Sequence, residues 1–255
     1  MKVFKFGGAS VKDSDGIRNI LTVLKHTGFN NTLIVVSAMG KTTNALEKVV
    51  HSYFENKEQF PKKFEAVRSN HHKIIEGLFT EDKALVIEKI DTLFNEALSF
   101  LSGNAVHNYS LVYDQVVSIG ELASSTIISY YMRHQGIENT WLDARKCIKT
   151  DNYYRDANLD WEKTKTEILT MVKGKSTLIS QGFIGSAPNG MTTTLGREGS
   201  DYSAAIFAYA LEADSVTIWK DVPGVLNGDP REFEDTVLLN PVSYTHLTLP
   251  TSDLV

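Results

Sequence analysis

A lysine followed by two glycines is the first feature of the chain that suggests chemistry. Lys5 precedes Gly7 and Gly8 at the end of a short apolar run that begins at Val3. Glycine lets backbone N–H groups approach an anion closely, because no Cβ intervenes, and a lysine ammonium can neutralise phosphate oxygens. The pattern therefore fits either a phosphate site or an ordinary tight turn beside a solvated lysine, and K-x-G-G alone does not decide between them.

A second glycine and lysine pair, Gly40 and Lys41, matches only the end of a P-loop. The first glycine of that motif would stand at position 35, which is Val35, so we reject a P-loop. Thr42 and Thr43 follow the pair directly. They are candidates for hydroxyl donors at the start of a helix, or for simple helix caps.

Residues 182–202 contain the densest group of glycine, threonine and charged residues in the chain. A glycine turn at Gly182 follows a run typical of a strand, and a helix is expected from about Ser200. The N-terminus of that helix would direct N–H groups at a negative ligand. Arg197 can pair with a carboxylate through two hydrogen bonds. Ser200 and Asp201 could instead cap the helix, but the segment holds more polar residues than a cap requires.

Glu121 lies in a largely apolar stretch, residues 116–128. A carboxylate in such surroundings is costly unless it meets a cation, and the ammonium of a substrate would supply one. The alternative is a partly exposed glutamate on a helix surface.

Charge and glycine occur together after three predicted strands, at Gly7, Gly182 and Asp221. Ligands of open parallel sheets bind beyond the carboxyl ends of the strands, so this coincidence favours one shared site more strongly than any single motif. No metal site is expected, because the spacing of the two histidines and the glutamate near residue 72 fits a helix surface: His71, His72 and Glu76.

Strand and helix patterns alternate along most of the chain. Residues 14–25 have a helical pattern, and Ser14 is the expected N-cap of that helix. Residues 44–133 are almost all helical in pattern, which indicates a helical insertion. The alternation predicts a three-layer α/β/α sandwich with a mostly parallel central sheet. Apolar, β-branched runs predict its strands at residues 3–6, 32–37, 140–142, 177–180 and 215–219, the last as a buried strand.

The composition is that of an ordinary globular protein. The 255 residues are 42% hydrophobic and 22% charged, and the formal net charge of -5 argues against a nucleic-acid-binding surface. The start of the chain lacks the apolar core of a signal peptide, and no apolar run reaches the ~18 residues of a membrane span. We therefore expect a cytoplasmic protein that binds neither nucleic acid nor membrane.

Five segments together resemble the aspartate kinases, in the order and spacing of that family. They are residues 5–10, 120–122, 182–185, 193–202 and 221–231. The resemblance implies the amino acid kinase fold and ATP-dependent phosphorylation of the side-chain carboxylate of L-aspartate to 4-phospho-L-aspartate. That reaction is the first step towards lysine, threonine and methionine. Mg²⁺ is expected to be bound with the nucleotide.

The resemblance also implies roles for individual residues. Lys5 and Asp201 would be catalytic, with Lys5 bridging the transferring phosphoryl group. Substrate contacts would come from Ser37, Thr43, Glu121 and Arg197. Nucleotide contacts would come from Lys5, Gly7, Gly8, Ser10, Lys220, Asp221, Leu226 and Arg231. Many family members have threonine in place of Lys220 and tyrosine in place of Leu226, which weakens the expectation for contacts on the adenine side.

Two alternatives remain open at this point. One is a related kinase that acts on glutamate or carbamate, although the G-R-E-G-S-D-Y run at 196–202 favours aspartate. The other is an inactive fragment that at most binds aspartate or ATP. Aspartate kinases continue past residue 240 into further core elements and paired ACT regulatory domains. From the resemblance we also expect the full-length protein to be a homo-oligomer. Residues 242–255 instead look like a translated sequencing adapter, so we expect an incomplete catalytic domain over 1–241 and a non-native tail.

Overall fold

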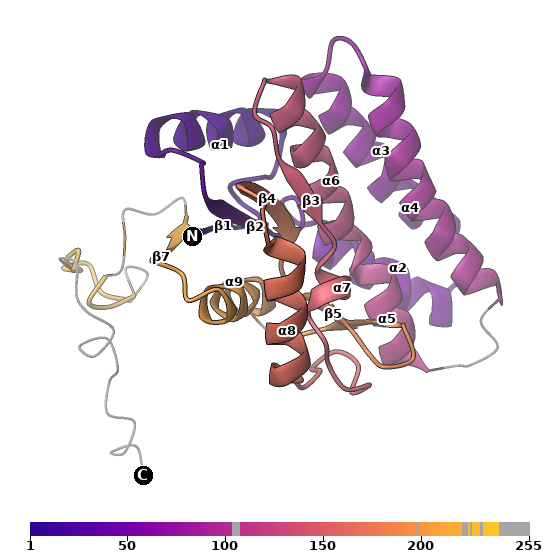
Figure 1. Cartoon of the computed structure of the whole chain (residues 1–255). Helices are drawn as coiled ribbons and strands as arrows, with labels where there is room; N and C mark the ends of the chain where they lie inside the picture. Colours follow the sequence, from indigo (N-terminus) through magenta and orange to yellow (C-terminus); the bar gives the residue numbers. More distant parts are fainter. Residues whose placement is uncertain (104–107, 197, 221–223, 225, 230–231, 240–255) are drawn as a thin grey trace. The chain divides into compact units, whose positions relative to one another are not determined.

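The computed structural model describes residues 1–103, 108–196, 198–220, 224, 226–229 and 232–239. Its contacts divide the chain into two units, Met1–Trp219 and Lys220–Val255. The first unit contains the central sheet and the helices that cover it (Figure 1).

Five parallel strands form the central sheet, in the order β3-β4-β2-β1-β7. Buried parallel strands consist of continuous apolar and β-branched runs, because both of their faces are covered. The runs identified in the sequence correspond to these strands, and the predicted mostly parallel sheet is confirmed. The strands are β1 (Lys2–Phe6), β2 (Thr32–Val36), β3 (Thr140–Leu142), β4 (Thr177–Gln181) and β7 (Ser215–Trp219).

The two faces of the sheet pack against two separate hydrophobic cores. In β1, Phe4 and Phe6 belong to one core and Val3 belongs to the other, as the alternation of side chains along a strand requires. Lys5 therefore lies on the same face of β1 as Val3. The core that includes Val3 also includes residues of α7 (Ala144–Cys147), α8 (Trp161–Val172) and α9 (Gly199–Ala210).

Helices from the first half of the chain form the other outer layer. Figure 1 shows this layer to one side of the sheet, and α6 makes its direct contacts with β2, β3 and β4. The predicted three-layer sandwich is thus confirmed, with the expected helical insertion spanning α2 to α6. The helices of this layer are α1 (Ser14–Thr27), α2 (Thr42–Glu55), α3 (Phe60–Leu78), α4 (Lys83–Gly103), α5 (Tyr109–Val117) and α6 (Ile119–His134).

His71 was expected on a helix surface, and that prediction was wrong. The residue is fully buried in α3, its ring packs edge-on against Phe94, and its Nδ1 lies 2.8 Å from the carbonyl oxygen of Val67. Burial lowers the pKa of His71 to about 4, so the ring is neutral at pH 7. His72 beside it is half-buried and contacts Asp91 at 2.9 Å.

Two local predictions also need correction. The N-cap of α1 is Asp13 rather than Ser14, because the Asp13 backbone is extended and its carboxylate accepts the Gly16 N–H at 2.8 Å. The strand at 215–219 is not buried: Val216 and Ile218 are 45% and 44% exposed. Within the described residues β7 pairs only with β1, so it forms an edge of the sheet.

The second unit is small in its described part. Leu226 forms an antiparallel bridge with Leu238, and Asn227 exchanges two hydrogen bonds with Val237, through its backbone N–H and its side-chain oxygen. The segment 242–255, for which we predicted a non-native tail, lies outside the described residues.

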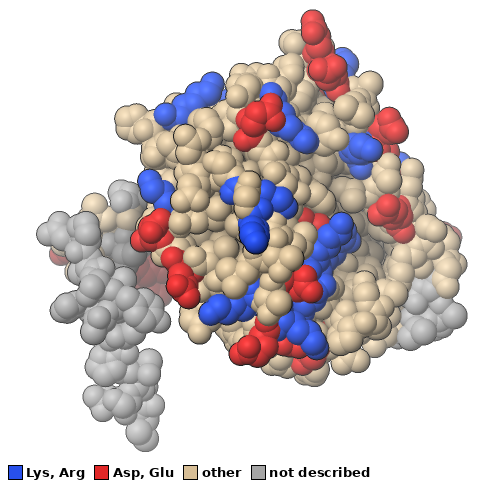
Figure 2. Space-filling model, viewed as in Figure 1, with Lys and Arg blue, Asp and Glu red and all other residues tan. Residues whose placement is uncertain are grey.

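Charged side chains of both signs are interspersed on the face of the molecule shown in Figure 2. Among the described helices, none is long and apolar enough to cross a membrane.

Candidate functional site

The loops after β1 and β2 lie directly against each other. The Ser37 N–H donates to the Phe6 carbonyl at 3.1 Å, and the Gly40 N–H donates to the Gly8 carbonyl at 2.9 Å. A Cβ on Gly8 would lie only 2.9 Å from the carbonyl oxygen of Ala38. Glycine is therefore required at position 8 by the close approach of the two backbones.

The first turn of α9 packs against the end of β4. The Gly182 N–H donates to the Val36 carbonyl at 2.9 Å, and a Cβ on Gly182 would lie 2.6 Å from the Cβ of Ser200. The residue before the helix, Glu198, has a φ of 58° and makes no capping hydrogen bond through its side chain. The positive end of the α9 dipole is thus held at the carboxyl edge of the sheet, as expected for an anion site.

Lys5 and Asp201 form a close ion pair at this edge. The Lys5 ammonium lies 2.6 Å from the Asp201 carboxylate, and Lys5 is only 6% exposed. The ammonium also lies 3.4 Å from the point that a Cβ on Gly7 would occupy, so the lysine side chain extends over the glycine turn. The ion pair joins the end of β1 to the start of α9.

Glu121 is buried in the first turn of α6. It is 3% exposed, and among the described residues its Oε2 has no hydrogen-bond partner. Burial raises the pKa of Glu121 to about 8, although hydrogen bonds from backbone groups of Glu121 and Ala38 act in the opposite direction. The alternative of a partly exposed surface glutamate is wrong. A cation beside this carboxyl would stabilise its charged form.

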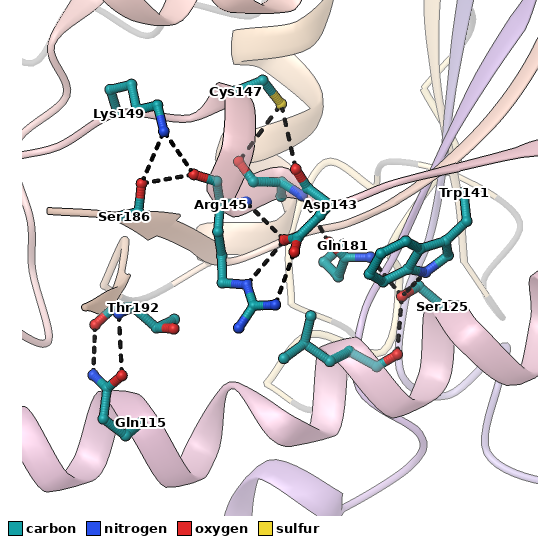
Figure 3. Close-up of polar contacts among 12 residues, drawn as sticks. Gln115, Ser125, Trp141, Asp143, Arg145, Cys147, Lys149, Gln181, Ser186 and Thr192 are labelled. Carbon is teal, nitrogen blue, oxygen red and sulfur yellow. Dashed lines mark hydrogen bonds and ion pairs between the residues drawn. The ribbon is translucent and has the colours of Figure 1, made fainter. Parts of the chain in front are cut away.

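A network of polar side chains fixes α6 against the sheet (Figure 3). The Gln181 amide donates to the Ser125 hydroxyl at 2.6 Å and accepts the Ala144 N–H at 2.8 Å. The Trp141 indole N–H donates to the same hydroxyl at 3.0 Å. Ser125 lies one helical turn after Glu121, so the network also sets the position of Glu121.

These elements surround a cavity of about 650 Å³, within the range of small-molecule sites. Gly7 and Ser10 form the adjoining turn, where the Ser10 N–H donates to the Gly7 carbonyl at 3.0 Å, but they do not line the cavity. Six of the residues expected in the site do line it: Lys5, Gly8, Ser37, Thr43, Glu121 and Asp201.

The remaining expected site residues do not belong to the described part of the first unit. Lys220 and Leu226 belong to the second unit. Arg197, Asp221 and Arg231 lie outside the described residues. Their roles remain predictions from the resemblance.

Three further residues line the cavity and were not anticipated: Glu47, Tyr113 and Arg155. The Tyr113 hydroxyl donates to the Glu47 carboxylate at 2.7 Å, and the Arg155 guanidinium carbon lies 4.6 Å from the centre of the Tyr113 ring. Burial and this hydrogen bond raise the pKa of Tyr113. Glu47 follows Thr43 by one helical turn, a spacing that could have indicated it. No local pattern connects Tyr113 with Arg155, because only the tertiary structure brings them together.

The cavity therefore combines two chemical environments. Around Lys5 and Asp201, a buried cation, closely packed glycine loops and a helix N-terminus suit a phosphate group. Around Glu121, a buried carboxyl whose Oε2 has no partner among the residues that the structure describes suits an ammonium group. Together these environments can hold an amino acid next to a phosphoryl donor.

Comparison with known proteins gives one consistent result. The model of the amino acid kinase family matches residues 1–254. Lysine-sensitive aspartokinase 3 of Escherichia coli is 35% identical over 233 residues, which are 90% of this chain and 51% of that protein. The chloroplastic bifunctional aspartokinase/homoserine dehydrogenase 2 of Arabidopsis thaliana is 32% identical over 95% of this chain and 27% of its own length.

Solved structures lead to the same group of proteins. E. coli aspartokinase III in complex with aspartate and ADP matches with a TM-score of 0.85 and 32% identity, over 94% of this chain and 53% of that one. The same enzyme in complex with lysine and aspartate matches with a TM-score of 0.82 and 33% identity. The chain thus spans about half the length, or less, of the relatives that it matches.

Proposed function

We propose that this chain, which belongs to the amino acid kinase family, transfers a phosphoryl group from ATP to the side-chain carboxylate of L-aspartate. The product would be 4-phospho-L-aspartate, an acyl phosphate at the entry to lysine, threonine and methionine synthesis. Support comes from the similarity to aspartokinases and, above all, from one observation: a single cavity joins the Lys5–Asp201 pair with the buried Glu121, whose Oε2 has no hydrogen-bond partner among the described residues.

In the proposed mechanism, catalysis consists of positioning and charge neutralisation. Lys5 holds the transferring phosphoryl group, and Asp201 keeps the Lys5 ammonium in place. Gly8 lets the loops after β1 and β2 pack together at the wall of the cavity, because a Cβ at this position would meet the carbonyl oxygen of Ala38. The reaction needs no covalent enzyme intermediate, since the substrate carboxylate attacks the γ-phosphorus directly while the bond to the bridging oxygen breaks and ADP leaves with its electron pair. Mg²⁺ bound with the nucleotide would neutralise part of the phosphate charge.

Binding of the acceptor is assigned to the α6 side of the cavity. Glu121 takes the substrate ammonium, which supplies the cation that its buried carboxyl lacks. Thr43 and Ser37 offer hydroxyl groups from the cavity wall. By resemblance, Arg197 would bind the α-carboxylate.

Replacement of Lys5 tests the proposal. In an assay of ADP release with aspartate as acceptor, Lys5→Ala should lower kcat by about 100-fold or more, because it removes charge from the transition state, and should change aspartate affinity far less. Lys149→Ala is the matched control, since Lys149 is a half-buried lysine that does not line the cavity. A kcat within about threefold of the wild-type value, roughly 0.65 kcal/mol, would contradict the role of Lys5. Faster turnover of glutamate than of aspartate would contradict the proposed acceptor.

A further inference from the structure

Arg155 has an unusual backbone conformation for a residue with a Cβ. Its φ is 75°, in the left-handed region that favours glycine. Six described residues other than glycine have a positive φ, and three of them line the cavity: Arg155, Phe183 and Glu198. Unfavourable backbone conformations that gather at one cavity are typical of functional sites.

A buried carboxylate holds Arg155 in this conformation. Asp114 is fully buried, and its Oδ2 accepts the Arg155 N–H at 3.0 Å. The same carboxylate accepts the Thr194 N–H at 2.9 Å and the Thr194 hydroxyl at 2.7 Å. The backbone of Arg155 is thus anchored to α5 and to β6 (Thr192–Thr194).

The side chain of Arg155 is held over aromatic rings. Its guanidinium carbon lies 4.6 Å from the centre of the Tyr113 ring and 5.6 Å from that of Tyr109. Tyr113 is oriented in turn by its hydrogen bond to Glu47. Stacking uses the flat face of a guanidinium and leaves the N–H donors at its edge suited to a planar anion such as a carboxylate.

The charges of the cavity point to the same role. Its described lining carries four carboxyl groups and two cations, and one of these cations, Lys5, is paired with Asp201. An acidic ligand therefore needs a further positive charge, and within the described lining Arg155 supplies it. Arg155 lies on the acceptor side, because Tyr113 joins it to Glu47, one helical turn from Thr43.

A second cavity of about 530 Å³ shares Glu47, Tyr113 and Arg155 with the first. Arg155 therefore borders both cavities, and the second cavity does not include Lys5 or Asp201. From this geometry we infer that Arg155 is a second specificity-determining residue, which binds the α-carboxylate of the acceptor amino acid in addition to the contact that the resemblance assigns to Arg197. The inference rests on the proposed function and adds a residue to it.

Equilibrium binding measured by calorimetry tests the inference without requiring turnover. The ligands are L-aspartate and its α-amide, which lacks the charge of the carboxylate that is not phosphorylated. Arg155→Gln should weaken aspartate binding about tenfold and binding of the α-amide less than twofold. Arg155→Lys keeps the charge but loses the stacked planar group, so its aspartate affinity should lie between that of Arg155→Gln and that of the wild type.

Arg133→Gln is the matched control. Arg133 also stacks on a tyrosine, at 4.5 Å from the centre of the Tyr130 ring, but it does not line the cavity, so this variant should bind aspartate normally. Thermal melting of each variant verifies that it is folded.

Two results would overturn the role of Arg155: aspartate binding within twofold of the wild type in Arg155→Gln, or equal weakening of both ligands. If either result is obtained and the wild-type chain binds and phosphorylates aspartate, only the inference about Arg155 is refuted. A wild-type chain that binds no aspartate would refute the proposed function, and the inference with it.

Discussion

Asp114 and Glu121 are two buried carboxyl groups on consecutive helices, and they have opposite surroundings. Asp114, on α5, is fully buried and accepts hydrogen bonds from the backbone of Arg155 and from the backbone and hydroxyl of Thr194. Glu121, on α6, is 3% exposed and faces the cavity with an oxygen that lacks a partner among the described residues. The described part of the protein satisfies Asp114 and leaves one oxygen of Glu121 without a partner.

The pKa values of the two groups follow this difference. Burial raises the pKa of Asp114 to about 6, with its hydrogen bonds limiting the rise, and it raises that of Glu121 to about 8. A buried polar group with all its partners inside the protein stabilises the fold, whereas one without a partner indicates a ligand that brings it. The comparison assigns Asp114 to structure and Glu121 to binding.

The largest effect is expected on stability, from Asp114→Ala. This variant leaves the Arg155 and Thr194 donors buried without an acceptor, so the free energy of unfolding should fall by about 3 kcal/mol. Chemical denaturation of the variant and the wild type measures this change in the free energy of unfolding. A loss below about 1 kcal/mol would show that the hydrogen bonds of Asp114 do not stabilise the fold.

A smaller effect, on binding instead of stability, is expected from Glu121→Gln. The variant removes the negative charge that the substrate ammonium needs, so aspartate affinity should fall about thirtyfold, or about 2 kcal/mol. The melting temperature should stay the same or rise, since a costly buried carboxyl is removed. Unchanged aspartate affinity together with a lower melting temperature would show that Glu121, like Asp114, stabilises the fold and does not bind the substrate.

The smallest effect is the change of affinity per unit of pH. In the ligand-free chain Glu121 is protonated below its pKa of about 8, and binding of an ammonium requires it to ionise. Aspartate affinity should therefore rise by up to about tenfold per pH unit between pH 6 and 8, and level off above. Calorimetry across this range measures the slope, which Glu121→Gln should abolish. A flat profile in the wild type would remove Glu121 from the binding step.

The stability of the ligand-free chain should change with pH in the opposite direction. Because the folded pKa of Glu121 is raised from its ordinary 4.5 to about 8, folding favours the protonated carboxyl. The contribution of Glu121 to the free energy of unfolding is thus greatest below pH 4.5 and is lost as the pH rises towards 8.

Much of the fold could be predicted, because its signals are local. A strand covered on both faces is largely apolar and β-branched, and the run at 32–36 therefore indicates β2 without any tertiary information. The error at β7 has the same origin, since the run at 215–219 has the pattern of a buried strand although it forms an edge of the sheet. His71 was misjudged because a single histidine on an amphipathic helix does not reveal which face is covered.

The local sequence was sufficient for the parts of the candidate site that depend on backbone geometry. Gly8 and Gly182 mark places where two backbones meet too closely for a Cβ, and Lys5 and Asp201 accompany the turns at a strand end and a helix start. Only the tertiary structure revealed that Glu121 is buried with an oxygen that no other described residue contacts by a hydrogen bond, and that Arg155 stacks on Tyr113. Burial and stacking depend on neighbours that are distant in the chain, and therefore no local pattern of residues contains them.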